Sequence, residues 1–424
     1  MITPERARAL ALVDGEHYPP VVRDAIAELP YEIVGAVLVG GTEKLRGRPE
    51  YGVPLFEGVM DALEDLRPEL VVDLSDEPIL GPVERFRLAS AVLAAGMPYV
   101  GADFRLDPPS FQPFPGRSLA VIGTGKRVGK TAVTGYVARL AAEHASVVVV
   151  AMGRGGPAEP ETITVPPTVD ALVELSRGGR HAASDHLETA ALVGVETIGC
   201  RRCGGGLAGA VYASNVEDGA RIAAGLDRDL VIFDGSGAAL PPIATDARVA
   251  VVGGHQDPRV VTGYLNAFRL LLADVVLVTM AEPGSGWEQV RDAVREVTRP
   301  AVRVVPTVLR PRPQRDIRGR STAFFSTAPG GAHATIAAHL AEEYDANVVH
   351  VSGNLANRSA LRAELAGVEA DVYLVELKAA AIDVVAEYAI GVGGEVVLAA
   401  NDVVEVSTER VLDETLLEMA RITS

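Results

Sequence analysis

The residues whose types and spacing most clearly suggest chemistry lie at positions 121–133, where the sequence reads VIGTGKRVGKTAV. This nearly matches the phosphate-binding pattern G-x-x-x-x-G-K-[ST], with Thr124 at the first glycine position. In such loops backbone N–H groups surround a phosphate, a lysine reaches the β and γ oxygens, and a hydroxyl holds Mg²⁺. We expect Lys130 to be catalytic and Thr131 to hold the metal. The nucleotide-binding residues would be Gly123, Thr124, Gly125, Lys126, Arg127, Val128, Gly129, Lys130, Thr131 and Ala132.

The segments around this loop fit a nucleotide site. An apolar run at 117–122 predicts a buried strand, and residues 132–143 predict the helix that follows. Glycines on both sides of Thr124 would still let the backbone turn tightly. The alternative is a glycine-rich turn that binds nothing. The order strand, loop, helix favours the nucleotide site.

Two further strand ends should reach the same site, because ligands of parallel α/β sheets bind outside the carboxyl ends of the strands. Asp234 ends an apolar run at 230–233, and we expect it to hold Mg²⁺. Arg154 follows another run, at 146–151, among glycines that would let it fold over transferring phosphates. We therefore expect Arg154 to be catalytic. A solvated aspartate and a plain glycine turn are the alternatives.

Composition limits the classes of partner and compartment. The chain has 424 residues, 48% of them hydrophobic, and a net charge of −17. This charge argues against nucleic acid or an anionic membrane as the main partner. Two cysteines cannot make a disulfide scaffold, and no apolar run is long enough to span a bilayer. We expect a soluble, cytoplasmic protein with no nucleic-acid and no membrane partner.

The order of apolar and polar segments predicts an α/β fold in three parts. Residues 1–115 indicate a small Rossmann-like domain that ends in a proline-rich linker. Residues 116–309 indicate a P-loop domain with a doubly wound parallel sheet. After a polar stretch from Arg310 to Arg320, residues 310–424 indicate a C-terminal α/β segment, which could also continue the P-loop domain.

Several segments together resemble one family. They are LVDGEHYPPVV near the start, the loop GTGKRVGKT, and then MGRGGP, FDGSGAALPP, AFFSTAP and ELKAAAIDVV. In this order they resemble cyclic 2,3-diphosphoglycerate synthetases over nearly the whole chain, whereas the loop alone is shared with dethiobiotin synthetases. The resemblance implies ATP and Mg²⁺ as cofactors and 2,3-diphosphoglycerate as substrate, which is closed into its cyclic pyrophosphate with release of ADP and phosphate. We also expect a homo-oligomer, specifically a dimer.

The implied reaction brings two polyanions together, since the substrate alone carries about five negative charges near neutral pH. An acidic protein must therefore build a local cationic clamp. Lys126, which we expect to be catalytic, would supply part of it together with Arg127 and Lys130. Arginine forks suit phosphate, so we expect the polar stretch to bind substrate through Arg312, Arg315, Arg318 and Arg320. A solvated linker is the alternative.

The segment Asp14-Gly-Glu-His17 matches the start of the family and follows the first predicted strand. We expect Asp14 and His17 to face the cleft and bind substrate; a capped turn is the alternative. A second acidic strand end, which includes Asp73 and Asp76, would hold a metal or cap a helix.

Lysine is rare in this chain, which makes Lys378 a candidate. The lysines are Lys44, Lys126, Lys130 and Lys378, against a total of 39 basic residues. Lys378 follows an apolar strand, so we expect it to contact a substrate phosphate as a compact charge, with Glu376 fixing its orientation. The alternative is a surface pair with Glu376 or Asp383.

Two other functions remain open. The loop would also suit a P-loop synthetase or kinase that acts on another small anion. A nucleotide-driven metallochaperone would instead carry metal on Cys200 and Cys203, although a lone C-x-x-C needs two more ligands to close a zinc site. We favour an arginine- and glycine-bearing loop near phosphate for this segment.

Overall fold

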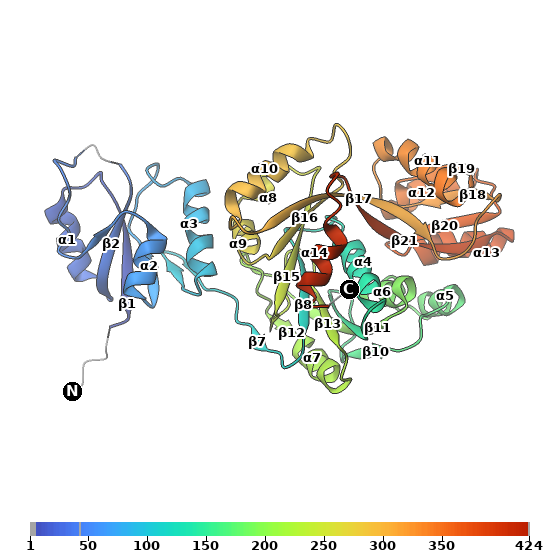
Figure 1. Cartoon of the computed structure of the whole chain (residues 1–424), viewed down its shortest axis with the longest axis horizontal. Coiled ribbons are helices and arrows are strands. Elements are labelled where there is room, and N and C mark those ends of the chain that lie inside the picture. Colours follow the sequence, from blue (N-terminus) through green and yellow to red (C-terminus); the bar gives the residue numbers. More distant parts are fainter. Residues whose placement is uncertain (1–5, 42–43, 423–424) are drawn as a thin grey trace.

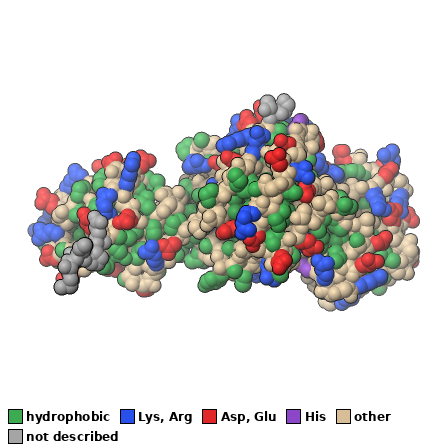
Figure 2. All heavy atoms as spheres, turned by 90° about the horizontal axis from the view of Figure 1, so that it is seen from below, with side chains coloured by type: hydrophobic (Ala, Val, Ile, Leu, Met, Phe, Trp, Pro, Cys, Tyr) green, Lys and Arg blue, Asp and Glu red, His purple; other side chains and the backbone are tan. Residues whose placement is uncertain are grey.

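The computed structural model describes residues 6–41 and 44–422 and confirms an α/β fold (Figure 1). An N-terminal unit, residues 8–106, lies at one end of the molecule, and a C-terminal unit, residues 307–405, lies at the other. The central unit, residues 118–306, stands between them. Figure 2 shows acidic and basic side chains interspersed on the face in view. Among the described residues, no helix combines the length and apolar character needed to cross a membrane.

The N-terminal unit has a six-stranded sheet in the order β3-β2-β1-β4-β5-β6, parallel except for the β5–β6 pair. The strands are β1 (Arg8–Asp14), β2 (Glu32–Gly40), β3 (Leu55–Phe56), β4 (Leu70–Asp73), β5 (Tyr99–Val100) and β6 (Arg105–Leu106). The helices are α1 (Pro19–Glu28), α2 (Val59–Leu66) and α3 (Pro82–Ala94). Helix α3 packs on the central unit, where the ring of Phe86 lies 5.7 Å from that of Tyr264.

The proline-rich connection after this unit is tied to the central unit rather than free. Its short strand β7 (Gln112–Pro113) pairs with β14 (Ile243–Ala244). The rings of Phe114 and Phe233 also pack edge to face, 5.2 Å apart. The prediction of a linker from proline content therefore missed these contacts.

The central unit is a mostly parallel sheet with helices on both faces, in which β10 and β12 pair antiparallel with β11. Its strands are β8 (Ser118–Gly123), β9 (Val147–Gly153), β10 (Glu161–Ile163), β11 (Glu196–Cys203), β12 (Ala213–Ser214), β13 (Leu230–Asp234), β15 (Ala247–Gly253), β16 (Val275–Thr279) and β17 (Arg303–Pro313). Its helices are α4 (Lys130–Ala142), α5 (Val169–Arg177), α6 (Asp185–Val193), α7 (Val216–Gly225), α8 (Pro258–Val261), α9 (Asn266–Leu271) and α10 (Trp287–Val297). Alternate residues of β8 enter two different cores, Ala120 on one face and Val121 on the other. This is the pattern of a doubly wound sheet.

Strand β17 joins the central and C-terminal units into one sheet of order β10-β11-β9-β13-β8-β15-β16-β17-β21-β20-β18-β19. Its first half pairs with β16 in parallel, and its second half, Thr307–Pro313, pairs antiparallel with residues 399–405 of β21. The C-terminal strands are β18 (Ser321–Phe325), β19 (Asn347–Ser352), β20 (Val372–Glu376) and β21 (Glu395–Glu405), and the helices are α11 (His333–Tyr344), α12 (Arg358–Leu365), α13 (Glu387–Val392) and α14 (Leu412–Met419).

Because of this pairing, the carboxyl ends of strands in the central and C-terminal units face each other. Strands β18 and β20 run parallel to β21 and therefore opposite to the central strands. Because β17 extends past the carboxyl edge of the central sheet, the carboxyl ends of β18 and β20 face that edge. The last helix, α14, returns to pack on α4.

The buried side chain of Arg269, in α9, connects two segments of the central unit. It is 2% exposed and donates hydrogen bonds to the carbonyls of Ala238 and Leu265, each at 2.8 Å. Burial lowers the pKa of Arg269 to about 10, so the side chain is still charged at neutral pH. It ties the loop after β13 to the helix on which the N-terminal unit packs.

We expect Arg269→Ala to lower the urea midpoint of unfolding, because each buried carbonyl left without a donor costs about 1–3 kcal/mol. Arg259→Ala is the matched control, since the side chain of Arg259 is 89% exposed. Denaturation followed by circular dichroism measures both. Equal midpoints for the two variants would contradict the anchoring role.

Candidate functional site

The loop between β8 and α4 has the geometry of a phosphate cradle. Gly129 has a φ of 80°, and a side chain there would meet Leu309 Cδ1 at 3.0 Å, so glycine is required. The hydroxyl of Thr279, at the end of β16, donates to the carbonyl of Val128 at 2.7 Å and holds the loop in place. Thr124 is buried, and its hydroxyl has no partner among the described residues.

An ion pair between Lys130 and Asp234 forms the centre of the site. The ammonium of Lys130 lies 2.9 Å from Asp234 Oδ1 and also donates to the carbonyl of Gly235. The hydroxyl of Thr134 donates to the same carboxylate oxygen at 3.0 Å. Burial raises the pKa of Asp234, although the Lys130 charge opposes this.

The second oxygen of Asp234 points to a missing ligand. Asp234 Oδ2 is buried and has no hydrogen-bond partner in the described part of the chain. An unpaired buried carboxylate oxygen is costly unless a donor or a cation satisfies it. Asp234 lies at the strand end beside the loop, so the donor set fits Mg²⁺ held with Thr131.

Three more cations lie beside the loop. Gly237 has Lys126 on one side and Arg202 on the other, since a Cβ there would lie 3.5 Å from Lys126 Cγ and 3.6 Å from Arg202 Nη2. Arg202, at the end of β11, is 6% exposed and donates to the carbonyl of Ser236 at 2.9 Å. Burial lowers the pKa of Arg202, and the nearby positive charge of Arg154 lowers it further. Lys126, Arg154 and Arg202 therefore form a cationic strip next to Lys130.

Carboxylates of helix α6 adjoin this strip. Asp185 Oδ2 lies 3.0 Å from where a Cβ of Gly153 would be, at the end of β9. Glu188 is 6% exposed, and its Oε1 lies 3.8 Å from Lys378 Nζ of the C-terminal unit. Burial raises the pKa of Glu188 to about 8, against the opposing charge of Lys378.

Lys378 is charged in these surroundings. Burial opposes its charge, but the carboxylates of Glu376, Glu188 and Asp185 outweigh burial, so the pKa of Lys378 is raised. Glu376, however, accepts a hydrogen bond from Asn401 at 2.9 Å, and the side chain within reach of Lys378 is Glu188. The structure therefore places Lys378 at the edge beside the loop, paired with a residue that the sequence did not indicate.

The four arginines that we expected to bind substrate do not lie together in the structure. We call them the arginine run: Arg312, Arg315, Arg318 and Arg320. Arg312 lines a narrow cleft with Thr131, Glu188 and Asn401, and its Nε lies 3.3 Å from a carboxylate oxygen of Asp402. The next three arginines do not reach this cleft. Arg315 and Arg320 pair with Glu395, the first residue of β21, and Arg318 lies 3.9 Å from Asp316.

This separation argues against the expectation that Arg315, Arg318 and Arg320 bind substrate beside the loop. Residues 395 and 401 are six positions apart on β21, which is about 20 Å along an extended strand. The run continues β17 through Pro313 and then turns back at the amino ends of β18, β20 and β21. Three of the four arginines consequently lie at the edge away from the loop.

Asp14 and His17 also bond away from the loop. Asp14 Oδ1 accepts hydrogen bonds from the ring of His17 at 3.1 Å and the backbone of Glu16 at 3.0 Å, all within the N-terminal unit. Among the described residues, neither side chain makes a hydrogen bond or ion pair with the central unit. The contacts of the described residues therefore give no support to the expectation that Asp14 and His17 bind substrate beside Lys130.

The two cysteines do not form a metal-binding pair. Cys200 is buried, and a Cβ on Gly219 of α7 would lie 2.4 Å from its sulfur, whereas Cys203 is exposed. An odd spacing of three places their side chains on opposite faces of β11. Burial also raises the pKa of Cys200 to about 12, which disfavours the thiolate that metals need. These observations argue against the metallochaperone hypothesis.

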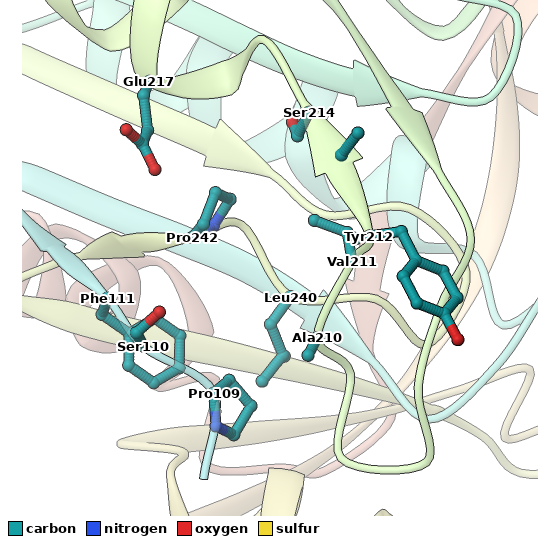
Figure 3. Close-up of a pocket in the computed structure, with 11 residues that line it drawn as sticks. Pro109, Ser110, Phe111, Ala210, Val211, Tyr212, Ser214, Glu217, Leu240 and Pro242 are labelled. Carbon is teal, nitrogen blue, oxygen red and sulfur yellow. The ribbon is translucent and has the colours of Figure 1, made fainter. Parts of the chain in front are cut away.

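A cavity away from the loop lies between the proline-rich connection and residues 210–217 (Figure 3). It has a volume of about 280 Å³ and is lined by residues such as Phe111, Val211 and Leu240. No lysine or arginine lines it. A cavity without cations cannot bind phosphates tightly, so we do not assign the nucleotide to it.

Known proteins match this chain along its length. Family models described as the N-terminal, P-loop and C-terminal domains of cyclic 2,3-diphosphoglycerate synthetase match residues 8–107, 118–308 and 313–402. The cyclic 2,3-diphosphoglycerate synthetase of Rubrobacter xylanophilus is 52% identical, covering 98% of this chain and 97% of that protein. That of Methanothermus fervidus is 41% identical, covering 94% and 93%. The ATP complex of LpxK from Aquifex aeolicus has a TM-score of 0.43 at 13% identity, covering 73% and 90%, which is a distant likeness.

We expect Glu188→Gln to change how stability depends on pH. A carboxyl whose pKa rises from 4.5 to about 8 on folding binds protons in the folded chain that the unfolded chain releases, so stability falls as the pH rises through this window. The variant lacks this pH-dependent loss of stability. The melting temperature of Glu188→Gln minus that of wild type should therefore become more positive as the pH rises from about 5 to about 8. Glu174→Gln, at an exposed position of α5, is the control. Parallel curves for wild type and Glu188→Gln would contradict the shift.

Proposed function

The chain belongs to the cyclic 2,3-diphosphoglycerate synthetase family, and we propose that it uses ATP to close 2,3-diphosphoglycerate into its cyclic pyrophosphate, with release of ADP and phosphate. The observation that carries this proposal is the group of cations at the loop. Lys126, Lys130, Arg154 and Arg202 gather at one strand edge of a chain whose net charge is −17. Such a group suits the meeting of two polyanions.

The P-loop fold implies nucleotide binding, and we assign the nucleotide as ATP. The loop backbone and Lys130 would hold its phosphates at the N-terminus of α4. Thr131 and Asp234 would hold Mg²⁺, which supports the assignment by satisfying the unpartnered Oδ2 of Asp234. When bound, this ion neutralises negative charge on the phosphates. Binding of ATP would also draw Lys130 from Asp234 toward the β and γ oxygens.

The chemistry requires two displacements at phosphorus. One substrate phosphate would take the γ-phosphoryl group of ATP and release ADP. An oxygen of the second substrate phosphate would then attack the phosphorus of the first, activated phosphate. The group that came from ATP would leave as inorganic phosphate, and the new P–O–P bond closes the ring. Both steps gather negative charge at one place, so the protein must hold the reacting oxygens close and in line.

We assign the substrate phosphates to the cationic strip. Arg154 is exposed beside the loop, while Arg202 is fixed by its hydrogen bonds to backbone carbonyls. Lys378 would contact the substrate from the opposite side, because the C-terminal unit brings it to the same edge. Glu188 then serves as a positioning residue for Lys378. The arginines at 315, 318 and 320 have no part in this assignment.

A P-loop kinase that acts on another small anion would share the loop, the metal residues and part of the strip. The two functions differ in their product. A kinase would transfer the γ-phosphoryl group and stop, whereas the synthetase also forms an intramolecular phosphoanhydride.

The direct test is a ³¹P NMR time course with ATP, Mg²⁺ and 2,3-diphosphoglycerate. We expect pyrophosphate-type resonances to appear together with ADP and inorganic phosphate. Lys130→Ala should reduce the rate on the order of a hundredfold or more, because it removes a charge directed at the transferring phosphate. ADP without a cyclic product would favour the kinase.

A second prediction separates the strip from the arginine run. Arg154→Gln should raise the KM for 2,3-diphosphoglycerate or lower kcat by about tenfold or more, with ATP affinity nearly unchanged. Arg315→Gln is the matched control and should retain wild-type kinetics, since Arg315 pairs with Glu395 far from the loop. Steady-state kinetics and a nucleotide-binding assay on both variants measure this. A silent Arg154→Gln would remove Arg154 from the site.

A further inference from the structure

The N-terminal unit has two buried aspartates at the ends of adjacent strands, and only one of them has a cationic partner. Asp73, at the end of β4, pairs with Arg85 at 2.8 Å and accepts a hydrogen bond from the Tyr99 hydroxyl at 2.7 Å. Asp14, at the end of β1, has a side chain that is 1% exposed. Among residues 6–41 and 44–422, no lysine or arginine lies within ion-pair distance of Asp14.

Asp14 is surrounded by hydrogen-bond donors that favour its ionised form. Its Oδ1 accepts from the Glu16 backbone and the His17 ring, and its Oδ2 accepts from the backbone N–H of Asp76 at 2.9 Å. A buried carboxylate in a folded protein is normally paired with a cation or bound to a metal. The local charge of Asp14 is therefore not balanced by a permanent cation.

Two further ligand types converge on the same point. Ligand atoms of Asp14, His17 and Asp76 all lie within 4.8 Å of one another, the one such group of three among the described residues. Two carboxylates and one imidazole are a donor set that first-row divalent metals accept. The side chain of His17 is 50% exposed and Asp76 is exposed, so one side of the group is open to solvent.

A buried hydroxyl beside the group is also unsatisfied. Tyr51 is 1% exposed, and its hydroxyl has no partner in the described part of the chain. Tyr51 packs in the same core cluster as Val13, the residue before Asp14. Burial raises the pKa of Tyr51, and the charge of Asp14 raises it further.

The group also lies where a ligand is expected. Asp14 and Asp76 follow the carboxyl ends of β1 and β4, and ligands of parallel sheets bind at such ends. From these observations together, we propose that Asp14, His17 and Asp76 bind a divalent transition-metal ion, Mn²⁺ or Zn²⁺, in the N-terminal unit. The ion is separate from the one assigned to Thr131 and Asp234. Its open side leaves coordination positions for water or an anionic ligand.

The test is calorimetric titration of MnCl₂ and ZnCl₂ into the full-length chain, first stripped with a chelator and kept free of nucleotide. We expect one ion per chain. His17→Gln and Asp76→Asn should each weaken binding by at least the ten- to hundredfold that loss of an outer partner of a metal site costs. Both side chains are at least half-exposed or on the surface, so these variants should fold.

Two control variants locate the ion. Asp24→Asn removes an exposed carboxylate of α1 in the same unit and should not change the affinity. Thr131→Ala should also retain the ion, because Thr131 belongs to the loop site but not to the buried pair of Lys130 and Asp234. As a second readout, the metal should raise the melting temperature of wild type and of both controls, and it should not raise that of His17→Gln.

Three results would overturn the proposal. The first is that neither ion binds below millimolar concentration. The second is that His17→Gln and Asp76→Asn both leave binding unchanged. The third is that binding is lost in Thr131→Ala, which would assign the ion to the loop.

Discussion

The buried ion pair between Lys130 and Asp234 is the constraint from which the rest of the site follows. Both side chains are nearly inaccessible to solvent, and neither charge could be buried at this position alone without a large cost. The pair fixes the first residue of α4 against the end of β13, and Thr134 in the next turn makes a second contact with the same oxygen. The orientation of α4 then sets the positions of Thr131 and of the loop glycines. Within the described part of the chain, it also leaves Asp234 Oδ2 without a hydrogen-bond partner.

The charges around this pair alternate in sign. The strip of Lys126, Arg154 and Arg202 lies on one side, and the carboxylates of Asp185 and Glu188 lie beside it. Without a bound polyanion, close cations repel one another, and the nearby Asp185 limits that repulsion. Lys378 completes the set from a different part of the chain. The site is therefore a balance of charges contributed by two units.

The sequence predicted the loop and most strands, because these features are local. The apolar runs at 117–122 and 230–233 correspond to β8 and β13, and the helix after the loop begins at Lys130 rather than Ala132. The arginine run could not be placed in the same way. Its location depends on how far β17 extends and on its antiparallel pairing with β21, which is a long-range property. Nothing in the sequence indicated Glu188 as a site residue, because it lies in a helix more than fifty residues from the loop.

The shared strand β17 also limits how the chain can be divided. Seven residues of β17, Thr307–Pro313, are paired with β21, so no boundary between the central and C-terminal units is free of backbone hydrogen bonds. Cutting the chain near residue 310 would leave an unpaired strand edge on each fragment, and exposed edges of this kind promote aggregation. The two units are therefore expected to be inherited, expressed and folded as a single piece. The N-terminal unit, which shares no strand with them, is the part that could be exchanged.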